Sequence, residues 1–330
     1  RTAPLPCGFL RPGALLKGAR LPPINLTIPL PLPELAPSMS AVLSSALPAS
    51  PPPGEREFDF EAADFQRVCT LIYQRAGINL QPGKQAMVYS RLSRRLRETR
   101  FASFAEYLQW LERATGAEAE AEWQEFVNCL TTNLTAFFRE EHHFPLLAQA
   151  LQARRGKAVR IWCSAASTGE EPYSLAMTAM EALGPSAVDR VEIVATDIDT
   201  NVLAKCEAGV YGEERIEKID PRYHKYFLRG TGAKAGFVRV KPDLQRMTSF
   251  RQLNLLAPDW PIQGQFDILF CRNVLIYFDK ETQRRVLERF IPYMAPDALL
   301  FVGHSESLLH LGDLFRLRGK TVYELRNQGR

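Results

Sequence analysis

The sequence contains no long hydrophobic run, no paired cysteines and no strong excess of one charge. None of its apolar stretches reaches the roughly 20 residues that cross a bilayer, and proline repeatedly interrupts those near the N-terminus. Its six cysteines include no Cys-x-x-Cys pair, so no disulfide framework is indicated. The 41 basic and 37 acidic residues give a net charge of +4, too little to predict a polyanionic partner. We therefore expect a soluble protein of the reducing cytoplasm.

The first 55 residues differ in composition from the rest of the chain. They are rich in Pro, Ala, Leu and Ser, a composition that disfavours helix and sheet and predicts a disordered leader over 1–55. The chain begins with Arg1, whereas Met39-Ser40 is a more ordinary protein start. This predicts that residues 1–38 are upstream translated sequence.

Residues 56–147 carry apolar side chains at helical spacing, as in Phe65, Val68 and Ile72, and predict a small all-α domain. Within it, five arginines fall between Arg91 and Arg100. A solvated helix face is the ordinary interpretation of such a run. Because charges of one sign repel each other, the cluster also indicates that an acidic partner docks there.

Residues 148–330 show the alternation of a doubly wound, mostly parallel α/β sheet. The expected strands are 159–163, 191–196, 266–271 and 298–302, and the expected helices between them are 172–183, 201–208 and 281–294. An insertion at about 209–250 predicts a small separate β-subdomain built on a hairpin. The segment 315–325 predicts an antiparallel edge hairpin that turns at Gly319-Lys320.

The loop after the first expected strand lies where such sheets bind ligands. It has one glycine followed by Glu170 and Glu171 and lacks the Gly-x-Gly-x-x-Gly spacing of a pyrophosphate-binding turn. Two carboxylates would repel the phosphates of a dinucleotide, so an uncharged or cationic cofactor such as S-adenosylmethionine fits better. The alternative is that both acids only complement the helix dipole.

Two further strand ends carry polar residues toward the same rim. At the second strand, Asp197 is a candidate acceptor for ribose hydroxyls, whereas Asp199 is better explained as a helix N-cap. Arg272 and Asn273 close the next core strand, where they either complete a pocket or brace a loop.

Other polar runs in the sequence are weaker evidence of a functional site. His142 and His143 are adjacent, and adjacent residues on a helix point apart, so we expect structural histidines and no metal site. The run 303–307 places a serine two residues after a glycine but lacks the second glycine of Gly-x-Ser-x-Gly, so it does not predict a hydrolase. At least one of Phe137 and Phe138 is expected in the core.

Three motifs, 131–140, 163–174 and 271–278, together resemble the chemotaxis receptor glutamate methyltransferases, the CheR family, nearly letter for letter. The similarity extends over about residues 58–325. It implies S-adenosylmethionine as methyl donor and glutamate side chains of chemoreceptor cytoplasmic domains as acceptors. The products would be glutamate methyl ester and S-adenosylhomocysteine.

The resemblance also implies roles for residues. Arg139 and Tyr277 would flank the transferred methyl group. The helix that carries the arginine run would dock the acidic, helical methylation region of the receptor, and the inserted hairpin resembles the form that grips a C-terminal tether peptide by strand addition. The implied cofactor contacts are Asn133, Thr135, Arg139, Glu170, Asp197, Asn254, Leu255, Arg272 and Asn273, and the implied substrate contacts are Arg91, Arg94, Arg95 and Arg97.

Two alternatives stay open. One is a methyltransferase with another acceptor, such as a nucleic-acid base or a small molecule, although residues 273–277 do not supply the Asn/Asp-Pro-Pro-aromatic tetrapeptide common in base methylation. The other is a non-catalytic signalling module that binds the cofactor. We expect a cytoplasmic monomer that binds no nucleic acid and meets the membrane only through the receptor.

Overall fold

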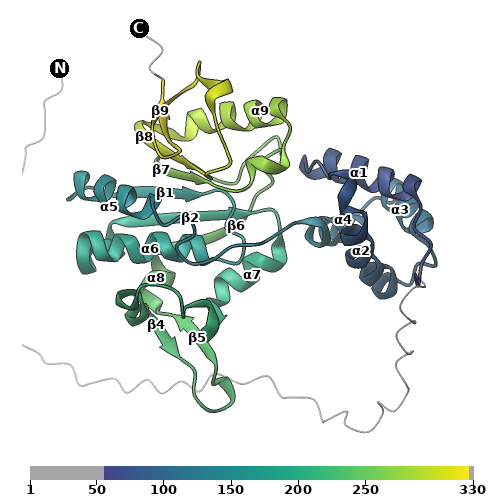
Figure 1. Ribbon diagram of the computed structural model, residues 1–330, viewed down its shortest axis with the longest axis horizontal. Helices are drawn as coiled ribbons and strands as arrows, with labels where there is room; N and C mark the ends of the chain where they lie inside the picture. The colour runs from purple at the N-terminus through teal and green to yellow at the C-terminus, as the bar shows by residue number, and fades with distance from the viewer. Residues whose placement is uncertain (1–55, 327–330) are drawn as a thin grey trace, which may run out of the picture. The chain divides into compact units, whose positions relative to one another are not determined.

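The computed structural model describes residues 56–326 (Figure 1). The expected disordered leader and the expected start at Met39 lie outside the described residues. Within residues 56–326, no helix has the length and apolar character needed to span a membrane.

Four helices form the all-α part predicted from the sequence. Their bounds are α1 (Ala62–Ala76), α2 (Gln85–Thr99), α3 (Phe104–Arg113) and α4 (Ala117–Leu130). Gly77 ends α1 with a positive φ of 69°, a conformation that glycine adopts without strain. The apolar stripes of the four helices share one core that includes Val68, Ile72 and Leu92, all of them fully buried.

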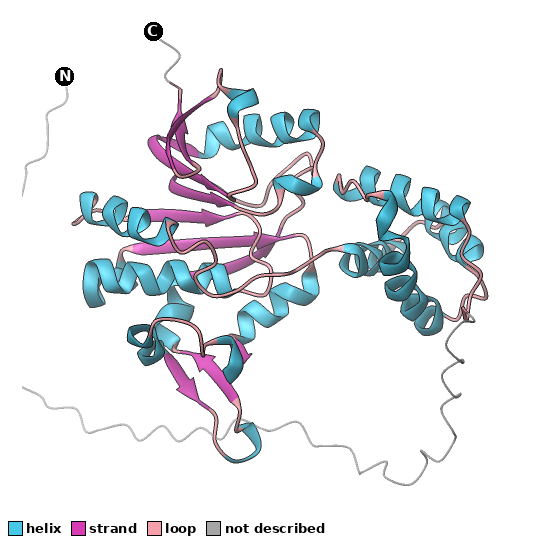
Figure 2. Ribbon diagram, viewed as in Figure 1, coloured by secondary structure: helices cyan, strands magenta, loops and turns pink. Residues whose placement is uncertain are grey.

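A seven-stranded sheet follows, in the order β6-β2-β1-β7-β8-β10-β9. Figure 2 shows the strands in magenta with helices around them. The strands of this sheet are β1 (Val159–Cys163), β2 (Val191–Asp197), β6 (Thr248–Gln252), β7 (Phe266–Cys271), β8 (Met294–Val302), β9 (Phe315–Gly319) and β10 (Val322–Leu325). The first five are parallel, and β10 is antiparallel to both β8 and β9. The predicted doubly wound sheet with an antiparallel edge hairpin is therefore confirmed.

Side chains of the strands alternate between two cores. Ile161 and Cys163 face a core shared with α5 (His143–Ala153) and α6 (Glu170–Leu183), whereas Trp162 faces the core of α9 (Lys280–Phe290). Because both faces are covered, the strands are apolar on both sides. Helix α5 packs on α6 and so lies with the sheet, although it spans the domain boundary expected at residue 147.

The insertion contains a second, three-stranded antiparallel sheet in the order β3-β5-β4. Its strands are β3 (Val210–Gly212), β4 (Phe227–Arg229) and β5 (Phe237–Val240). We call residues 210–240 the β-subdomain. Helix α7 (Thr200–Ala208) precedes it, and α8 (Pro242–Met247) follows it. Strand β6 begins inside the range expected for the insertion and pairs with β2. The expected domain bounds stay predictions.

Short 3-10 helices connect these elements. They are Pro82–Lys84, Gly184–Asp189, Glu213–Arg215, Pro221–Tyr226, Gly232–Lys234, Leu275–Tyr277, Ile291–Tyr293 and Leu309–Leu311.

Asp199 ties the exit of the helical part to the sheet. Its Oδ1 accepts hydrogen bonds from the backbone N–H groups of Asn201 and Val202, so it is the N-cap of α7, as predicted. Its Oδ2 accepts from Thr131 Oγ1 at 2.6 Å and from Asn133 Nδ2 at 2.7 Å. One buried carboxylate therefore fixes the segment that follows α4 against the end of β2.

Candidate functional site

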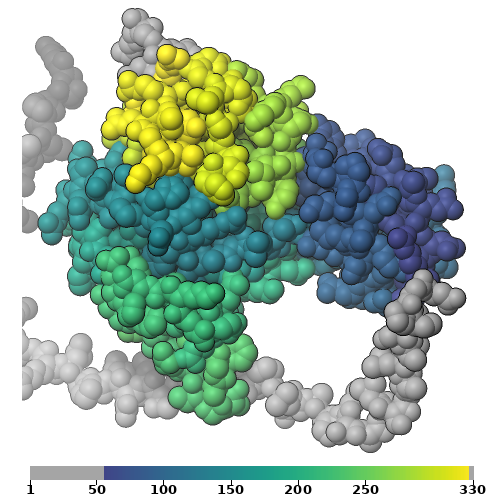
Figure 3. Space-filling view, in the orientation of Figure 1, coloured from purple at the N-terminus to yellow at the C-terminus, as the bar shows by residue number. Residues whose placement is uncertain are grey.

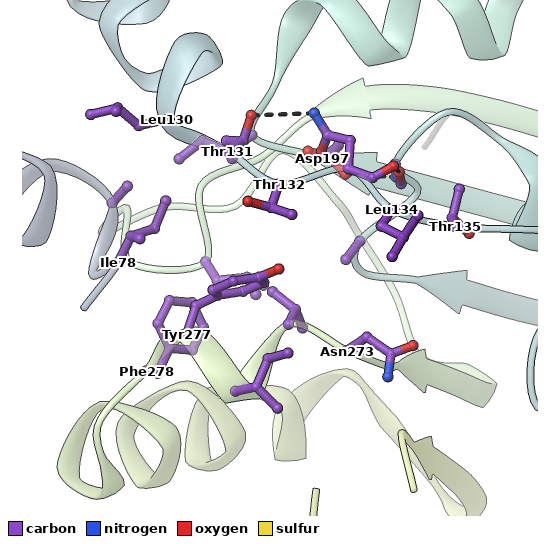
Figure 4. A pocket seen from close by; sticks show the side chains of 18 of the residues that line it. Ile78, Leu130, Thr131, Thr132, Leu134, Thr135, Asp197, Asn273, Tyr277 and Phe278 are labelled. Atoms are coloured by element: carbon purple, nitrogen blue, oxygen red, sulfur yellow. Dashed lines mark hydrogen bonds between the residues drawn. The ribbon is translucent and has the colours of Figure 1, made fainter. Parts of the chain in front are cut away.

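A cavity of about 290 Å³ lies at the carboxyl ends of β1, β2 and β7. Figure 4 shows side chains from the segment Leu130–Thr135 and from the loop Asn273–Phe278 around the same space. The segment Ile78–Gln81 of the helical part also lines it. The backbone N–H of Asn79 donates to the carbonyl of Tyr277 at 2.9 Å, so the helical part is hydrogen-bonded to the loop beside the cavity.

Most of the site residues predicted from the sequence line this cavity. They are Asn133, Thr135, Arg139, Asp197, Asn254, Leu255, Arg272, Asn273 and Tyr277. The structure therefore brings together residues that are up to about 140 positions apart in the chain. Their individual roles toward cofactor or substrate stay predictions.

Glu170 is not among the lining residues; its neighbour Glu171 is. The Glu170 side chain is buried, forms an ion pair with Arg215 and accepts a hydrogen bond from Thr168 Oγ1 at 2.6 Å. Glu171 instead accepts from Arg272 Nη1 at 2.7 Å, and burial raises the pKa of its carboxyl. The sequence could not separate two adjacent acids at a helix start, because only the rotation of α6 decides which one lines the cavity.

Asp197 ends β2 and is 8% exposed. Its carboxylate accepts from the backbone N–H of Ser167 at 2.8 Å and of Asp199 at 3.0 Å. Burial outweighs these two bonds and raises the pKa of Asp197 to about 6. A buried carboxylate in this position is stabilised by further donors, which the hydroxyls of a ribose would supply.

Arg272 joins the segments around the cavity. Its side chain is fully buried, lies 2.7 Å from Glu171 and 3.3 Å from Glu140, and donates to the carbonyl of Arg139. Burial alone would raise the pKa of Glu140, but the Arg272 guanidinium and hydrogen bonds from His304 and Asn273 lower it to about 2. Glu140 is therefore a fixed anion at neutral pH.

Glu306 is a site residue that the sequence analysis missed. Its Oε1 accepts from the backbone N–H groups of Leu275 and Ile276, and its Oε2 accepts from those of Asn273 and Gly303, at 2.6 to 3.3 Å. This single carboxylate therefore holds the loop that carries Asn273 and Tyr277. This acid lies in the run 303–307, but no local pattern links it to the loop around Asn273.

Strained backbone is concentrated around the cavity. Phe138, Glu140, Ser167 and Asn273 have positive φ angles between 49° and 58°, a region that non-glycine residues rarely adopt. Such conformations persist where surrounding contacts enforce them, and they cluster at functional sites. Contacts of Arg272 and Glu306 hold Glu140 and Asn273 in this way, and the backbone N–H of Ser167 donates to Asp197.

The two histidines require a correction. We expected their rings to point apart on a helix, but His142 precedes α5, and the ring centroids lie 4.2 Å apart. Ligand atoms of Glu140, His142 and His143 lie within 4.8 Å of one another. The Arg272 guanidinium contacts Glu140 and opposes a second cation there, so we do not propose a metal site. His143 is buried, and burial lowers its pKa to about 4.

The arginines of α2 do not share one free face. Arg91 donates to the backbone carbonyls of Cys129 and Thr131, and Arg95 is ion-paired with Glu122 and Glu98. These two side chains therefore hold α4 and its exit. The other two are solvent-exposed: Arg94 lies 3.5 Å from Glu98, and Arg97 pairs with Glu57.

Replacing Glu306 with glutamine tests its role. The amide keeps the shape, but its NH₂ must face two of the four backbone donors, so the free energy of unfolding is expected to fall by about 2–3 kcal/mol. Urea unfolding followed by circular dichroism measures this change. Glu288→Gln, at an exposed partner of Arg284, is the control and should change stability by less than about 0.5 kcal/mol. Equal effects of the two variants would contradict the role of Glu306.

Comparison with known proteins places these features in a family. Residues 63–131 match the model of the CheR methyltransferase all-alpha domain, and residues 133–324 match that of the CheR methyltransferase SAM binding domain. The chain is 53% identical over 277 residues to "Chemotaxis protein methyltransferase 2" of Pseudomonas aeruginosa, covering 83% of this chain and 97% of that protein. It is 52% identical over 264 residues to the "Chemotaxis protein methyltransferase" of Escherichia coli, covering 80% and 91%.

The cavity fits the cofactor of this family, S-adenosylmethionine. Its sulfonium and ammonium groups are cationic, and the carboxylates of Asp197 and Glu171 are in the lining. Because both family models and these relatives match most of its length, the chain belongs to the CheR methyltransferase family.

Proposed function

We propose that this protein transfers a methyl group from S-adenosylmethionine to glutamate side chains of chemoreceptor cytoplasmic domains, forming methyl esters in chemotactic adaptation. The observation that carries the proposal is one cavity lined by residues from all three motifs, among them Asn133, Glu171 and Asn273. The names of the relatives, chemotaxis protein methyltransferases, support the receptor as acceptor.

Methyl transfer to glutamate requires orientation of the acceptor carboxylate rather than a general base. When bound, S-adenosylmethionine supplies an electrophilic methyl group on its sulfonium. A glutamate carboxyl has an ordinary pKa near 4.3 and is ionised at neutral pH. The remaining barrier lies in placing a hydrated, weakly nucleophilic carboxylate in line with that methyl group, to which orientation can contribute roughly 7–11 kcal/mol.

Arg139 and Tyr277 are the proposed orienting residues. Both line the cavity, and Arg139 Nη1 donates to the carbonyl of Leu134 at 2.8 Å. The backbone contacts of Arg272 and Glu306 hold the segments that carry them. An exclusive ion pair between Arg139 and the acceptor would stabilise the ground state, because negative charge leaves the carboxylate in the transition state. We therefore assign Arg139 an orienting role shared with Tyr277.

The remaining assignments concern binding. We propose that Asp197 accepts the ribose hydroxyls and that Asn133, Thr135, Asn254, Leu255 and Asn273 contact the rest of the cofactor. Arg94 and Arg97 are the exposed arginines of α2, and we propose that they contact an acidic receptor helix. The protein is proposed to act as a cytoplasmic monomer, and a receptor tether peptide is the proposed ligand of the β-subdomain.

The acceptor is identified by incubating the protein with radiolabelled S-adenosylmethionine and receptor-bearing membranes. Base-labile label in the receptor band is the expected result. Label in RNA, or in a small-molecule fraction, would replace glutamate by another acceptor. Donor that binds without being transferred would indicate a non-catalytic module.

Replacing Arg139 with alanine should slow single-turnover methyl transfer by roughly 10²-fold at saturating donor, because the acceptor carboxylate is then poorly oriented. Rapid-quench measurement of labelled receptor gives this rate. Arg155→Ala is the control, since Arg155 is exposed beyond the C-terminal end of α5, and it should transfer at the wild-type rate. Unchanged transfer by the Arg139 variant with cofactor bound would remove this residue from the mechanism.

Cofactor affinity should depend on pH through Asp197. The free protein protonates this carboxyl below pH 6, whereas ribose hydroxyls favour the carboxylate, so binding weakens as the pH falls. The dissociation constant of S-adenosylhomocysteine should rise about tenfold between pH 7.5 and pH 5. Glu140 and His143 have pKa values of about 2 and 4, so the first stays ionised and the second stays largely neutral between pH 7.5 and pH 5.

Calorimetric titration at several pH values measures this dependence. Asp197→Asn should bind more weakly and with a flatter profile, and any slope that remains belongs to other carboxyls whose pKa is raised by burial, such as those of Glu171 and Glu306. A wild-type profile that is flat from pH 7.5 to 5 would refute the assignment of Asp197.

A further inference from the structure

Two residues of the β-subdomain contact the segments that form the cofactor cavity. Arg215 donates to the backbone carbonyl of Thr135 at 2.8 Å and forms an ion pair with Glu170. Tyr211 on β3 donates its hydroxyl to the carbonyl of Thr168 at 2.9 Å. Figure 3 shows the green residues of the subdomain adjoining the teal residues of the sheet domain.

The Arg215 guanidinium bridges two walls of the cavity. Thr135 lines the cavity on one side, and Glu170 directly precedes Glu171, which lines it on another. The Glu170 side chain is 1% exposed, whereas that of Arg215 is 38% exposed. A buried carboxylate needs its cationic partner, because leaving it unpaired is costly. Arg215 therefore links the segment of Thr135 to the start of α6.

Aromatic packing joins the subdomain to the segment that leads to Arg139. Phe137 makes edge contacts with Tyr211 and Phe227 at centroid distances of 5.0 and 5.3 Å, and Phe138 stacks on Tyr223 at 4.1 Å. Both phenylalanines are thus packed against the subdomain, and Phe137 is part of the buried core, as expected.

The loop beside Thr168 has no space for a side chain at Gly169. A Cβ added at Gly169 would lie 2.5 Å from the Tyr211 hydroxyl oxygen and 3.1 Å from Cys206 Sγ. The hydroxyl of Tyr211 therefore approaches the backbone of the cofactor loop as closely as glycine allows.

We propose that Arg215 is a positioning residue for S-adenosylmethionine, so that the β-subdomain maintains the shape of the cofactor cavity in addition to any contact with receptor. Arg215 acts through Thr135 and Glu170 and does not itself line the cavity. The inference rests on the proposed function only in that this cavity binds the cofactor.

Two substitutions at this position test the inference on the full-length protein. Arg215→Ala removes both contacts. Arg215→Lys keeps a charge beside Glu170, but an ammonium lacks the planar fork that reaches the carboxylate and the carbonyl together. Arg246→Ala is the matched control, because Arg246 forms an exposed pair with Asp243 on α8, outside the subdomain.

The measurements are calorimetric binding of S-adenosylhomocysteine and the KM for S-adenosylmethionine. Arg215→Ala should weaken both by roughly tenfold, and Arg215→Lys by an intermediate factor, while the KM for receptor stays unchanged. A variant that only unfolds in part lowers the active fraction and leaves these constants unchanged. In wild type, the cofactor product should also slow amide hydrogen exchange in β4 and β5, and Arg215→Ala should remove that protection.

Wild-type constants in Arg215→Ala, or equal losses in Arg246→Ala, would overturn the inference. Absence of binding by the folded wild-type protein would instead refute the cofactor cavity itself, so the two failures are distinguishable.

Discussion

The buried guanidinium of Arg272 is the interaction on which the site depends. It contacts Glu171 at the start of α6, Glu140 and the carbonyl of Arg139. Together with Arg272 itself, these groups come from three separate segments of the chain. Removing one partner of such a buried network costs several kcal/mol, because a charge is left without compensation. The network therefore favours one arrangement of the cavity walls over alternatives that separate these charges.

The charges at the site have different functions that follow from their surroundings. Glu140 and Glu171 are paired with Arg272, and Glu306 is saturated by backbone donors. Asp197 accepts two backbone hydrogen bonds and has no cationic partner among residues 56–326, and burial raises its pKa to about 6. Paired carboxylates shape the protein, whereas a carboxylate without a cation remains available to a ligand.

Apolar packing supplies the rigidity that this polar network needs. The sheet is covered on both faces, and the segment of Phe137 and Phe138 packs against aromatic residues of the β-subdomain. Left-handed backbone conformations at Phe138 and Asn273 are tolerated within this framework. Their cost, of order 1–3 kcal/mol each, is offset by contacts on either side of the cavity.

Much of the fold was predictable, because strands β1 and β7 are apolar runs with clear ends. Strand β6 was not, since Thr248–Gln252 is half-exposed and carries little periodicity; its place in the sheet comes from pairing with β2. The N-cap role of Asp199 was predictable because an aspartate just before a helix can accept hydrogen bonds from the first backbone N–H groups of that helix.

The parts of the site that the sequence did not reveal depend on tertiary contacts. The choice between Glu170 and Glu171 depends on helix rotation, and the internal use of Arg91 and Arg95 depends on where α4 packs. Glu306 acts on a loop some 30 residues earlier in the chain, a relation that no local pattern encodes.

The most direct test of the account is calorimetric titration of S-adenosylhomocysteine into the folded wild-type protein and into Arg272→Met, with folding of both checked by circular dichroism. The account predicts one equivalent bound by the wild type and binding weakened by at least about tenfold in the variant. No heat from the folded wild type, or equal affinity in a folded variant, would contradict it.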